Sequence, residues 1–303
     1  MSTAAIDRSA APARTRRAAD VWLWIVLPTT AVFCLIFATP ILDLTALSFH
    51  AMTGPAQVGD AFTLANYRAF VTDPFYLQIL LRTCWLGALV TLGCLVIGYP
   101  VAYYLARTSS RWRGMALFLV ISPLLVSAIV RNIGWFPLLS ESGLVNWALL
   151  KLGVIGAPLP LVNNFTGVVI GLVHALLPFM ILTLTTVIQR IDADLEEAAA
   201  NLGAGPLEAF WRVLLPLSLP GVVSGSLLVF TMAISAYTTP AILGGNRVLV
   251  MATYIAQQFR TVLNYPAGGT AAALLLVFAA LLTLLALQVR TADGESASEG
   301  RGA

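Results

Sequence analysis

Six long apolar runs, separated by shorter polar segments, dominate the pattern of this chain. A helix needs roughly 20 residues to cross the hydrocarbon core of a bilayer, and each run has about that length. The runs are 21–47, 77–106, 115–136, 165–188, 221–243 and 268–289. Helices are expected because an open strand would leave backbone groups unpaired in lipid, and the alternation typical of a membrane barrel does not occur. The pattern therefore predicts an all-α membrane protein with six transmembrane helices.

Composition supports the same class of protein. The chain is 59% hydrophobic and 10% charged, whereas soluble domains are typically about 25% charged, so a soluble globule is excluded. The formal charge of +3 comes mainly from arginines beside the spans and gives no indication of nucleic acid. Three cysteines, Cys34, Cys84 and Cys94, fall within spans and have neither disulfide nor metal-ligand spacing. We expect them to be packing residues.

The distribution of positive charge predicts the orientation. With the N-terminus in the cytoplasm, eleven of the 17 lysines and arginines fall on the cytoplasmic side: Arg8, Arg14, Arg16, Arg17, Arg107, Arg111, Arg113, Arg190, Arg212, Arg290 and Arg301. Cytoplasmic loops usually carry this excess, so both termini are assigned to the cytoplasm. The first run is longer than a signal-peptide core and lacks a small-residue cleavage site, which favours an uncleaved span.

Shorter segments complete the predicted organisation. Residues 1–20 and 290–303 are read as disordered cytoplasmic tails around a membrane domain, 21–289. An outer loop follows the first span and contains a candidate surface helix at 62–70, while the amphipathic segment 143–152 is too short to cross and is expected at the outer interface. Two Gly-x-x-x-Gly pairs, beginning at Gly167 and Gly221, permit close helix packing. That packing is either within the chain or with a second subunit.

A polar segment between the fourth and fifth runs, 195–221, predicts a pair of short helices. Asp194 is placed to cap the first helix, with Glu197 at the third position of a capping box. Gly203 is expected to end that helix because glycine adopts a left-handed conformation without steric cost. Pro206 suits the first turn of a second helix, where its missing donor would be unpaired anyway. The chain is thus expected to fold back on itself.

The second helix of this segment is predicted to be amphipathic. Glu208 and Arg212 are spaced to pair on one face, and Pro216 and Pro220 are expected to end the helix. Another face carries an apolar stripe at spacings of three and four: Leu207, Phe210 and Leu214. Such a stripe is suited to docking on a partner. The alternative is a surface hairpin that only joins two spans.

The polar segment resembles the EAA loop of importer-type ABC permeases. The pattern is Glu197-Ala198-Ala199, three residues, Gly203, nine residues, then Val213-x-Leu215-Pro216, with valine where isoleucine is usual. Further segments, including FTLANYRAF (62–70), GYPVAYYLAR (98–107) and TTPAILGG (238–245), resemble the first permease subunit of spermidine/putrescine importers. Iron, thiamine and opine importers share several of these segments. The resemblance implies a type I importer permease fold of the MetI-like kind, with a cytoplasmic EAA coupling helix.

The resemblance also implies partners and roles. It implies a second, related permease forming a heterodimer, two ATP-binding subunits that hold MgATP, and a periplasmic or lipoprotein solute-binding protein, in a bacterial inner membrane. The residues it assigns to ATPase coupling are Glu197, Ala198, Ala199, Gly203, Ala204, Phe210, Val213, Leu215 and Pro216. The solute it implies is a polyamine such as spermidine or putrescine. Another solute of the same importer class remains an alternative.

The chain itself carries no recognisable catalytic chemistry. It has no GxxxxGK[ST] phosphate loop, and its one lysine, Lys151, has no phosphate-cradling glycines around it. No HExxH, CxxC or GxSxG pattern occurs. We therefore expect neither an enzyme, a cofactor nor a metal in this chain. A secondary carrier, which usually needs charged groups at mid-bilayer, is the other alternative and is poorly supported.

A few polar and aromatic residues are candidates for the solute path. A polyamine is positively charged, so carboxylates and aromatic faces are the groups expected to attract it. The candidates are Asp43, Arg131, Trp135, Glu141 and Tyr237. Each has a structural alternative, such as a charge pair or a helix-end position. His174, within the fourth run, is either a proton relay or a neutral side chain bonded to a neighbouring helix.

Overall fold

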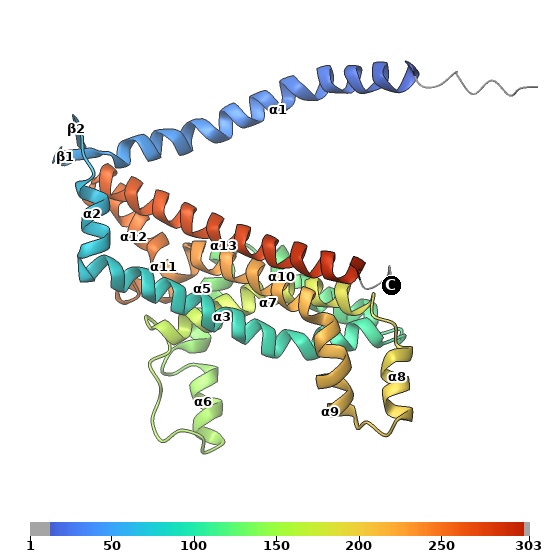
Figure 1. The fold of residues 1–303 in the computed structure, drawn as a ribbon. Coiled ribbons are helices and arrows are strands. Elements are labelled where there is room, and N and C mark those ends of the chain that lie inside the picture. Colours follow the sequence, from blue (N-terminus) through green and yellow to red (C-terminus); the bar gives the residue numbers. More distant parts are fainter. Residues whose placement is uncertain (1–12, 300–303) are drawn as a thin grey trace, which may run out of the picture.

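In the computed structural model, the backbone is described for residues 13–299 and the side chains for residues 26–284 other than 246. The elements, in chain order, are α1 (Ala13–Ser48), β1 (His50–Gly54), β2 (Gln57–Phe62), α2 (Ala65–Thr72), α3 (Pro74–Arg107), α4 (Arg113–Leu125), α5 (Ala128–Leu139), α6 (Leu144–Lys151), α7 (Phe165–Ile188), α8 (Asp194–Asn201), α9 (Pro206–Ala209), η1 (Phe210–Leu214), α10 (Leu215–Ser235), α11 (Thr238–Leu243), η2 (Gly245–Arg247), α12 (Met251–Gln257), η3 (Gln258–Val262) and α13 (Tyr265–Glu299). Figure 1 shows their arrangement.

Long helices account for the predicted spans. Among the described residues, five helices are long and apolar enough to cross a membrane, and a sixth span results if α4 and the helices after it are counted as one broken span. The predicted run 165–188 coincides with α7, whose first turn is capped by Asn164: its side-chain oxygen accepts from the Thr166 amide at 3.0 Å. Asp73 caps α3 in the same way, with Pro74 at the first helical position.

Two predicted tails are partly helical. Residues 13–20 belong to α1 and residues 290–299 to α13, so the prediction of disorder there was wrong. Residues 13–20 are rich in alanine and arginine, which favour a helix. They directly precede the apolar run 21–47 and belong to the same helix. The remaining predicted tails, 1–12 and 300–303, lie outside the described residues.

The third predicted span is broken rather than straight. Between α4 and α5 the chain bends by 100°. Pro123 cannot donate a backbone hydrogen bond, and the carbonyl of Leu119 instead accepts from the Ser122 hydroxyl at 2.9 Å. The Pro123 carbonyl accepts from Nη1 of Arg131, across the break, at 2.8 Å. These side chains satisfy backbone groups that a break would otherwise leave unpaired in a membrane.

The fifth span begins and ends earlier than predicted. The helix is continuous from Pro206 to Ser235, and α11 is a separate short helix after it. Pro216 and Pro220 therefore do not end the second polar helix, as the sequence had suggested. The π-helical turn η1, in which the Leu215 amide donates to the Phe210 carbonyl, widens the helix just before Pro216. The chain thus continues into α10 despite its prolines.

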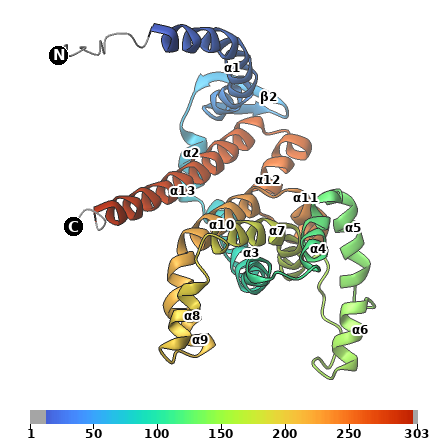
Figure 2. The ribbon, with the colours of Figure 1, turned by 90° about the vertical axis from the view of Figure 1, so that its right-hand side faces the viewer.

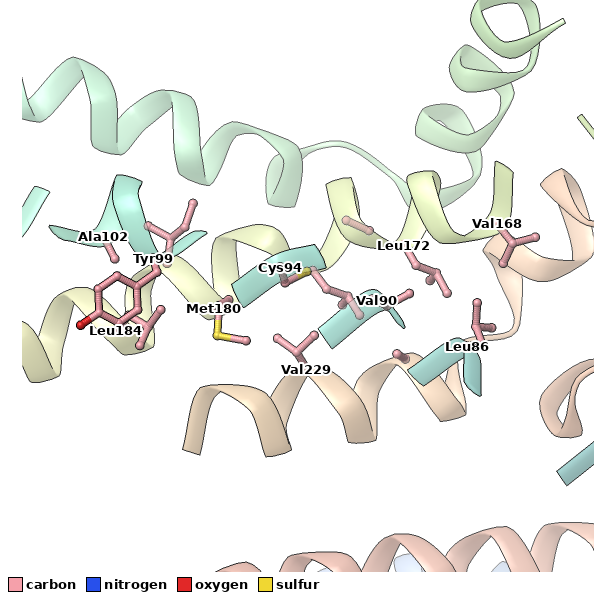
Figure 3. Packing of buried hydrophobic residues seen from close by; sticks show 14 of the residues in the cluster. Leu86, Val90, Cys94, Tyr99, Ala102, Val168, Leu172, Met180, Leu184 and Val229 are labelled. Atoms are coloured by element: carbon pink, nitrogen blue, oxygen red, sulfur yellow. The ribbon is translucent and has the colours of Figure 1, made fainter. Parts of the chain in front are cut away.

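Three helices, α3, α7 and α10, form the core of the molecule. Figure 3 shows their buried side chains, among them Val90 and Cys94 of α3, Met180 of α7 and Val229 of α10, all fully buried. Cys94 is a packing residue as expected, whereas Cys34 is exposed on α1. A β-carbon placed on Gly225 of α10 would lie 2.9 Å from the Met180 sulfur. The glycine pair of α10 therefore serves packing within the chain.

The first helix diverges from this core. Only its C-terminal end packs against α13, where the Ser48 carbonyl accepts from the Thr270 hydroxyl at 3.3 Å, and Figure 1 shows α1 leaving α13 toward its N-terminal end. The loop after α1 contains the antiparallel hairpin β1–β2 and then α2. Helix α2 overlaps the predicted surface helix 62–70, but it begins three residues later and ends two residues later. The hairpin was not predicted.

Two helical arms extend from one side of the bundle. Figures 1 and 2 both show α6 and the pair α8–α9 projecting in the same direction, with α6 near one end and α8–α9 at the other. The predicted short helix 143–152 corresponds to α6. Asn146, which is fully buried, bonds the carbonyls of Ser140 and Leu159 and the Leu159 amide, and so closes the α6 arm on itself.

Candidate coupling site

The polar hairpin, which we define as α8, α9 and η1 (194–214), lies between α7 and α10. Its first helix begins one residue earlier than predicted. Asp194 is the first helical residue, Ala193 is the cap, and no side chain caps the helix. The predicted capping box is therefore wrong. The Asp194 amide instead donates to Oδ1 of Asp192 at 3.1 Å, just before the helix.

The turn of the polar hairpin follows the prediction. Gly203 has a φ of +90°, which glycine alone adopts without strain. Its amide donates to the Ala200 carbonyl at 2.9 Å, and the Ala204 amide donates to the Ala199 carbonyl at 3.0 Å, which closes the end of α8. Pro206 then occupies the first turn of α9. Helix ending and helix starting are thus local properties of these residues.

The EAA-pattern residues divide between the surface and the interior. Four of them are exposed and available to a partner: Glu197, Ala198, Gly203 and Pro216. The other five are half-buried against the chain: Ala199, Ala204, Phe210, Val213 and Leu215. The pattern therefore includes both exposed residues and residues that pack against the rest of the chain.

The predicted apolar stripe is only partly buried. Leu214 is 2% exposed and Phe210 is half-buried, but Leu207 is 72% exposed because the first turn of α9 extends beyond the bundle. Leu202, at the tip, is 90% exposed, and Trp211 is 59% exposed. Sequence reasoning missed these two. Their high exposure places both side chains on the surface of the polar hairpin rather than in the core.

Charged residues bind the polar hairpin internally and to the rest of the chain. The predicted pair is present, with Nη1 of Arg212 3.0 Å from Oε1 of Glu208. A second pair was missed: Arg107, the last residue of α3, donates through Nε and Nη2 to Oε1 of Glu196 at 2.9 and 2.5 Å. The Tyr103 hydroxyl donates to the other Glu196 oxygen at 2.9 Å. Arg107 and the hairpin therefore lie at the same end of the molecule.

Two of the solute-path candidates lie beside the break in the third span. Arg131 is engaged with the Pro123 carbonyl as described above, and Trp135 donates from Nε1 to Nδ1 of His174 at 3.1 Å. Since Nδ1 accepts this bond, the imidazole is in the form that carries its proton on Nε2. His174 is thus bonded to a neighbouring helix, as one of its two predicted interpretations proposed.

The other three candidates lie on an exposed helix and in two different pockets. Asp43 is exposed on α1. Glu141 lines a pocket of about 720 Å³ together with Arg247. Tyr237 lines another pocket, of about 520 Å³, where its hydroxyl accepts from Nη1 of Arg260 at 3.4 Å. The structure thus does not bring the five candidates together in one cavity.

The arrangement is that of a membrane permease with a protruding polar hairpin, and comparison with known proteins identifies the family. Residues 94–293 match the model of the binding-protein-dependent transport system inner membrane component. The chain belongs to this family. It is therefore a multi-pass component of the inner membrane.

Individual relatives narrow the comparison. The chain is 35% identical to the spermidine/putrescine transport system permease protein PotB of Salmonella typhimurium, over 86% of this chain and 91% of the relative. It is 36% identical to PotB of Escherichia coli K12, over 81% and 89%. The molybdenum transport system permease protein ModB of Mycobacterium bovis is 31% identical, over 76% and 85%.

Solved structures support the fold. A bacterial ABC transporter involved in the import of the polysaccharide alginate has a chain that superposes with a TM-score of 0.70 at 19% identity, over 91% of this chain and 96% of that one. The MetNI methionine ABC transporter gives 0.54 at 17% identity, over 73% and 98%. The fold predicted from the resemblance, a type I importer permease of the MetI-like kind, is therefore confirmed.

Proposed function

We propose that this chain is the permease subunit of an ATP-driven importer that takes up polyamines such as spermidine and putrescine. The observation that carries the proposal is the polar hairpin: a short helix pair between two spans, with Glu197, Ala198 and Gly203 exposed at its surface. A rigid projection of this kind is suited to contact a moving partner and to transmit its displacement to the adjoining spans. The named relatives support the choice of solute.

The energy for transport comes, in this proposal, from separate subunits. Two ATP-binding subunits bind MgATP and receive the exposed residues of the polar hairpin, while this chain binds no nucleotide and catalyses no reaction. Their closure changes the relative stability of outward- and inward-open states of the permease. A second permease completes the conduit as a heterodimer, and a solute-binding protein delivers the polyamine. Both termini and the polar hairpin lie in the cytoplasm.

Within the conduit we propose Glu141 and Tyr237 as the first solute-path residues to test, because each lines an open pocket. A carboxylate and an aromatic face are both suited to an organic cation. Asp43 and Trp135 offer the same two kinds of group. However, Asp43 lies exposed on α1, and the Trp135 indole already donates a hydrogen bond to His174. Arg131, a cation bonded to the Pro123 carbonyl, is the candidate least suited to attract a polyamine.

The function is tested by uptake into proteoliposomes. The chain is co-expressed with the second permease and the ATPase of the proposed importer, reconstituted, and supplied with the solute-binding protein and radiolabelled spermidine. We expect spermidine uptake that requires ATP on the side of the membrane that the ATPase faces. Unlabelled putrescine is expected to inhibit this uptake. Iron, thiamine, opine and molybdate serve as competitors. Inhibition by one of these in place of polyamines would reassign the solute, and uptake driven by an ion gradient by this chain alone would refute the importer.

A further inference from the structure

One face of α3 meets both legs of the polar hairpin. Tyr99, Tyr103 and Arg107 recur at intervals of four over the last turns of α3, so their side chains lie along one side of the helix. The EAA pattern, 197–216, does not include this face. Its contacts join residues that are 119 and 89 positions apart in the chain. Local sequence patterns do not predict pairs at such separations.

The first leg, α8, is held through a single carboxylate. Both oxygens of Glu196 are used: Oε1 accepts from Arg107 and Oε2 accepts from the Tyr103 hydroxyl. Nη1 of Arg107 also donates to the Ile191 carbonyl, just before α8, at 2.9 Å. The side chains of Arg107 and Glu196 are only 19% and 20% exposed. Hydrogen bonds to a charged carboxylate that is partly shielded from water are stronger than hydrogen bonds between neutral groups.

The second leg is held through Tyr99. Its hydroxyl lies 2.7 Å from the Ser218 hydroxyl of α10 in a buried hydrogen bond. Its ring meets the Phe210 ring of η1 edge to face, with centroids 5.3 Å apart and an angle of 85°. Leu214 of the same turn is buried beside it. The two legs therefore contact α3 by different chemistry, ionic for α8 and aromatic for η1.

We propose that this face of α3 receives the motion of the polar hairpin and that Tyr103, Arg107 and Glu196 are positioning residues for coupling. The proposal rests on the proposed function. Helix α3 lies in the core with α7 and α10, so a displacement of α8 that is linked to α3 moves the centre of the bundle. Without the link, α8 bends at its own connections and the displacement is lost. Glu208 and Arg212 do not serve this role, because they belong to the same leg.

A neutral variant of Glu196 tests the link in the chain alone. Glu196→Gln keeps the size of the side chain and removes its charge. We expect amide hydrogen exchange across α8 in the detergent-solubilised chain to become about tenfold faster. The matched control is Glu208→Gln, the same change in the other ion pair of the hairpin, whose partners are 78% and 44% exposed. It is expected to leave exchange in α8 within about twofold of the unmodified chain.

The assembled transporter tests the transmission. In proteoliposomes, Glu196→Gln is expected to retain the ATPase subunits and their hydrolysis but to lower solute uptake per ATP hydrolysed by about fivefold or more, while Glu208→Gln keeps the ratio. The exchange of charges, Arg107→Glu with Glu196→Arg, is expected to restore much of the ratio that either single change loses. A structural defect alone would lower assembly and hydrolysis together.

The proposal is overturned if Glu196→Gln changes neither the amide hydrogen exchange of α8 nor the solute uptake per ATP hydrolysed. It is equally overturned if Glu196→Gln changes both quantities no more than Glu208→Gln does. A third contrary result is a double variant, Arg107→Glu with Glu196→Arg, whose uptake per ATP hydrolysed is no higher than that of either single variant. A failure of the proposed function looks different: the unmodified complex would show no ATP-driven uptake at all. In that case the hydrogen-exchange experiment still decides whether α3 holds α8. Coupling through the α3 face is then rejected together with the importer.

Discussion

Gly203 links the conformation of one residue to the shape of the polar hairpin. Its φ of +90° is a conformation that side chains with a β-carbon rarely adopt. A β-carbon built at this position meets nothing within 4 Å, so the requirement for glycine is conformational and not steric. Replacing it changes the direction in which α9 leaves α8 without crowding any neighbour.

Gly203→Val is expected to uncouple the transporter. A β-branched residue at this φ costs about 1–3 kcal/mol, which favours a different turn and moves the exposed residues of α8 relative to α9. We expect membrane insertion and basal ATP hydrolysis to remain, while ATP-driven uptake falls by about tenfold or more. Uptake and hydrolysis are measured together in proteoliposomes.

The matched control is Gly205→Val, two positions away. Gly205 has a φ of −70° and a ψ of 164°, an extended conformation that valine adopts readily, and its β-carbon position is also open. This variant is expected to behave as the unmodified chain. Equal uptake by the two variants would show that the turn conformation is not needed for coupling.

What the sequence could predict at this scale was local. The turn at Gly203, the start of α9 at Pro206 and the Glu208–Arg212 pair each depend on residues within four positions, and each is present. The capping box failed because the helix begins one residue early, which makes Ala193 the cap and Asp194 the first helical residue. The Arg107–Glu196 pair was not predictable, because its partners are 89 positions apart and only the packed fold brings them together.

At the scale of elements, close approach of α10 to α7 depends on small residues. A β-carbon on Gly221 would lie 2.8 Å from Cβ of Val187 and 3.0 and 3.1 Å from its two methyl groups. Val187 is β-branched and has little freedom to move aside. The contact is therefore closed to any larger residue, which is how small residues let helices approach each other in membranes.

Alanine at Gly221 is expected to destabilise the chain although alanine is the better helix former. The helix preference favours alanine by up to about 1 kcal/mol, but overpacking against Val187 costs about 1–3 kcal/mol. The net effect is a lower midpoint of thermal unfolding in detergent. Gly134→Ala in α5 is the control, because its β-carbon position is open, and its midpoint is expected to stay the same or rise. Equal shifts in both variants would contradict the packing argument.

Element boundaries show where apolar patterning stops being informative. Span number followed from run length, and α7 was predicted at its observed bounds. The break after Leu125 was not, because residues 115–136 are apolar on both sides of it and the bonds that stabilise it, from Ser122 and Arg131, come from side chains whose partners the sequence does not specify. The end of α10 at Ser235 was missed because no charged residue separates it from α11.

For the whole molecule, the two arms and the arginines define its two ends. The arginines predicted to be cytoplasmic include Arg107 at the end of α3, Arg113 at the start of α4 and Arg190 after α7, and all three belong to the end that carries the polar hairpin. Helix α6 lies toward the other end (Figure 1). Because cytoplasmic ends usually carry the excess of arginine and lysine, we propose that this end, with the polar hairpin, faces the cytoplasm.

Labelling of single cysteines is the experiment for this orientation. Leu202 at the tip of the polar hairpin is 90% exposed, and Leu152 beyond α6 is 76% exposed, so a thiol at either position is accessible to a water-soluble reagent from its own side. The native cysteines, Cys34, Cys84 and Cys94, are first replaced by alanine, and uptake is checked. In intact spheroplasts, a membrane-impermeant maleimide is expected to label Leu152→Cys and to label Leu202→Cys only after permeabilisation.

The paired design separates topology from reactivity. Both positions become labelled once the membrane is opened, so a lack of label in intact spheroplasts reports the side of the membrane and not a buried thiol. The reversed pattern, with Leu202→Cys labelled from outside, would place the polar hairpin where no ATP-binding subunit reaches it. Coupling through Glu197, Gly203 and the α3 face would then be impossible, because the energy source and its contact surface would lie on opposite sides of the bilayer.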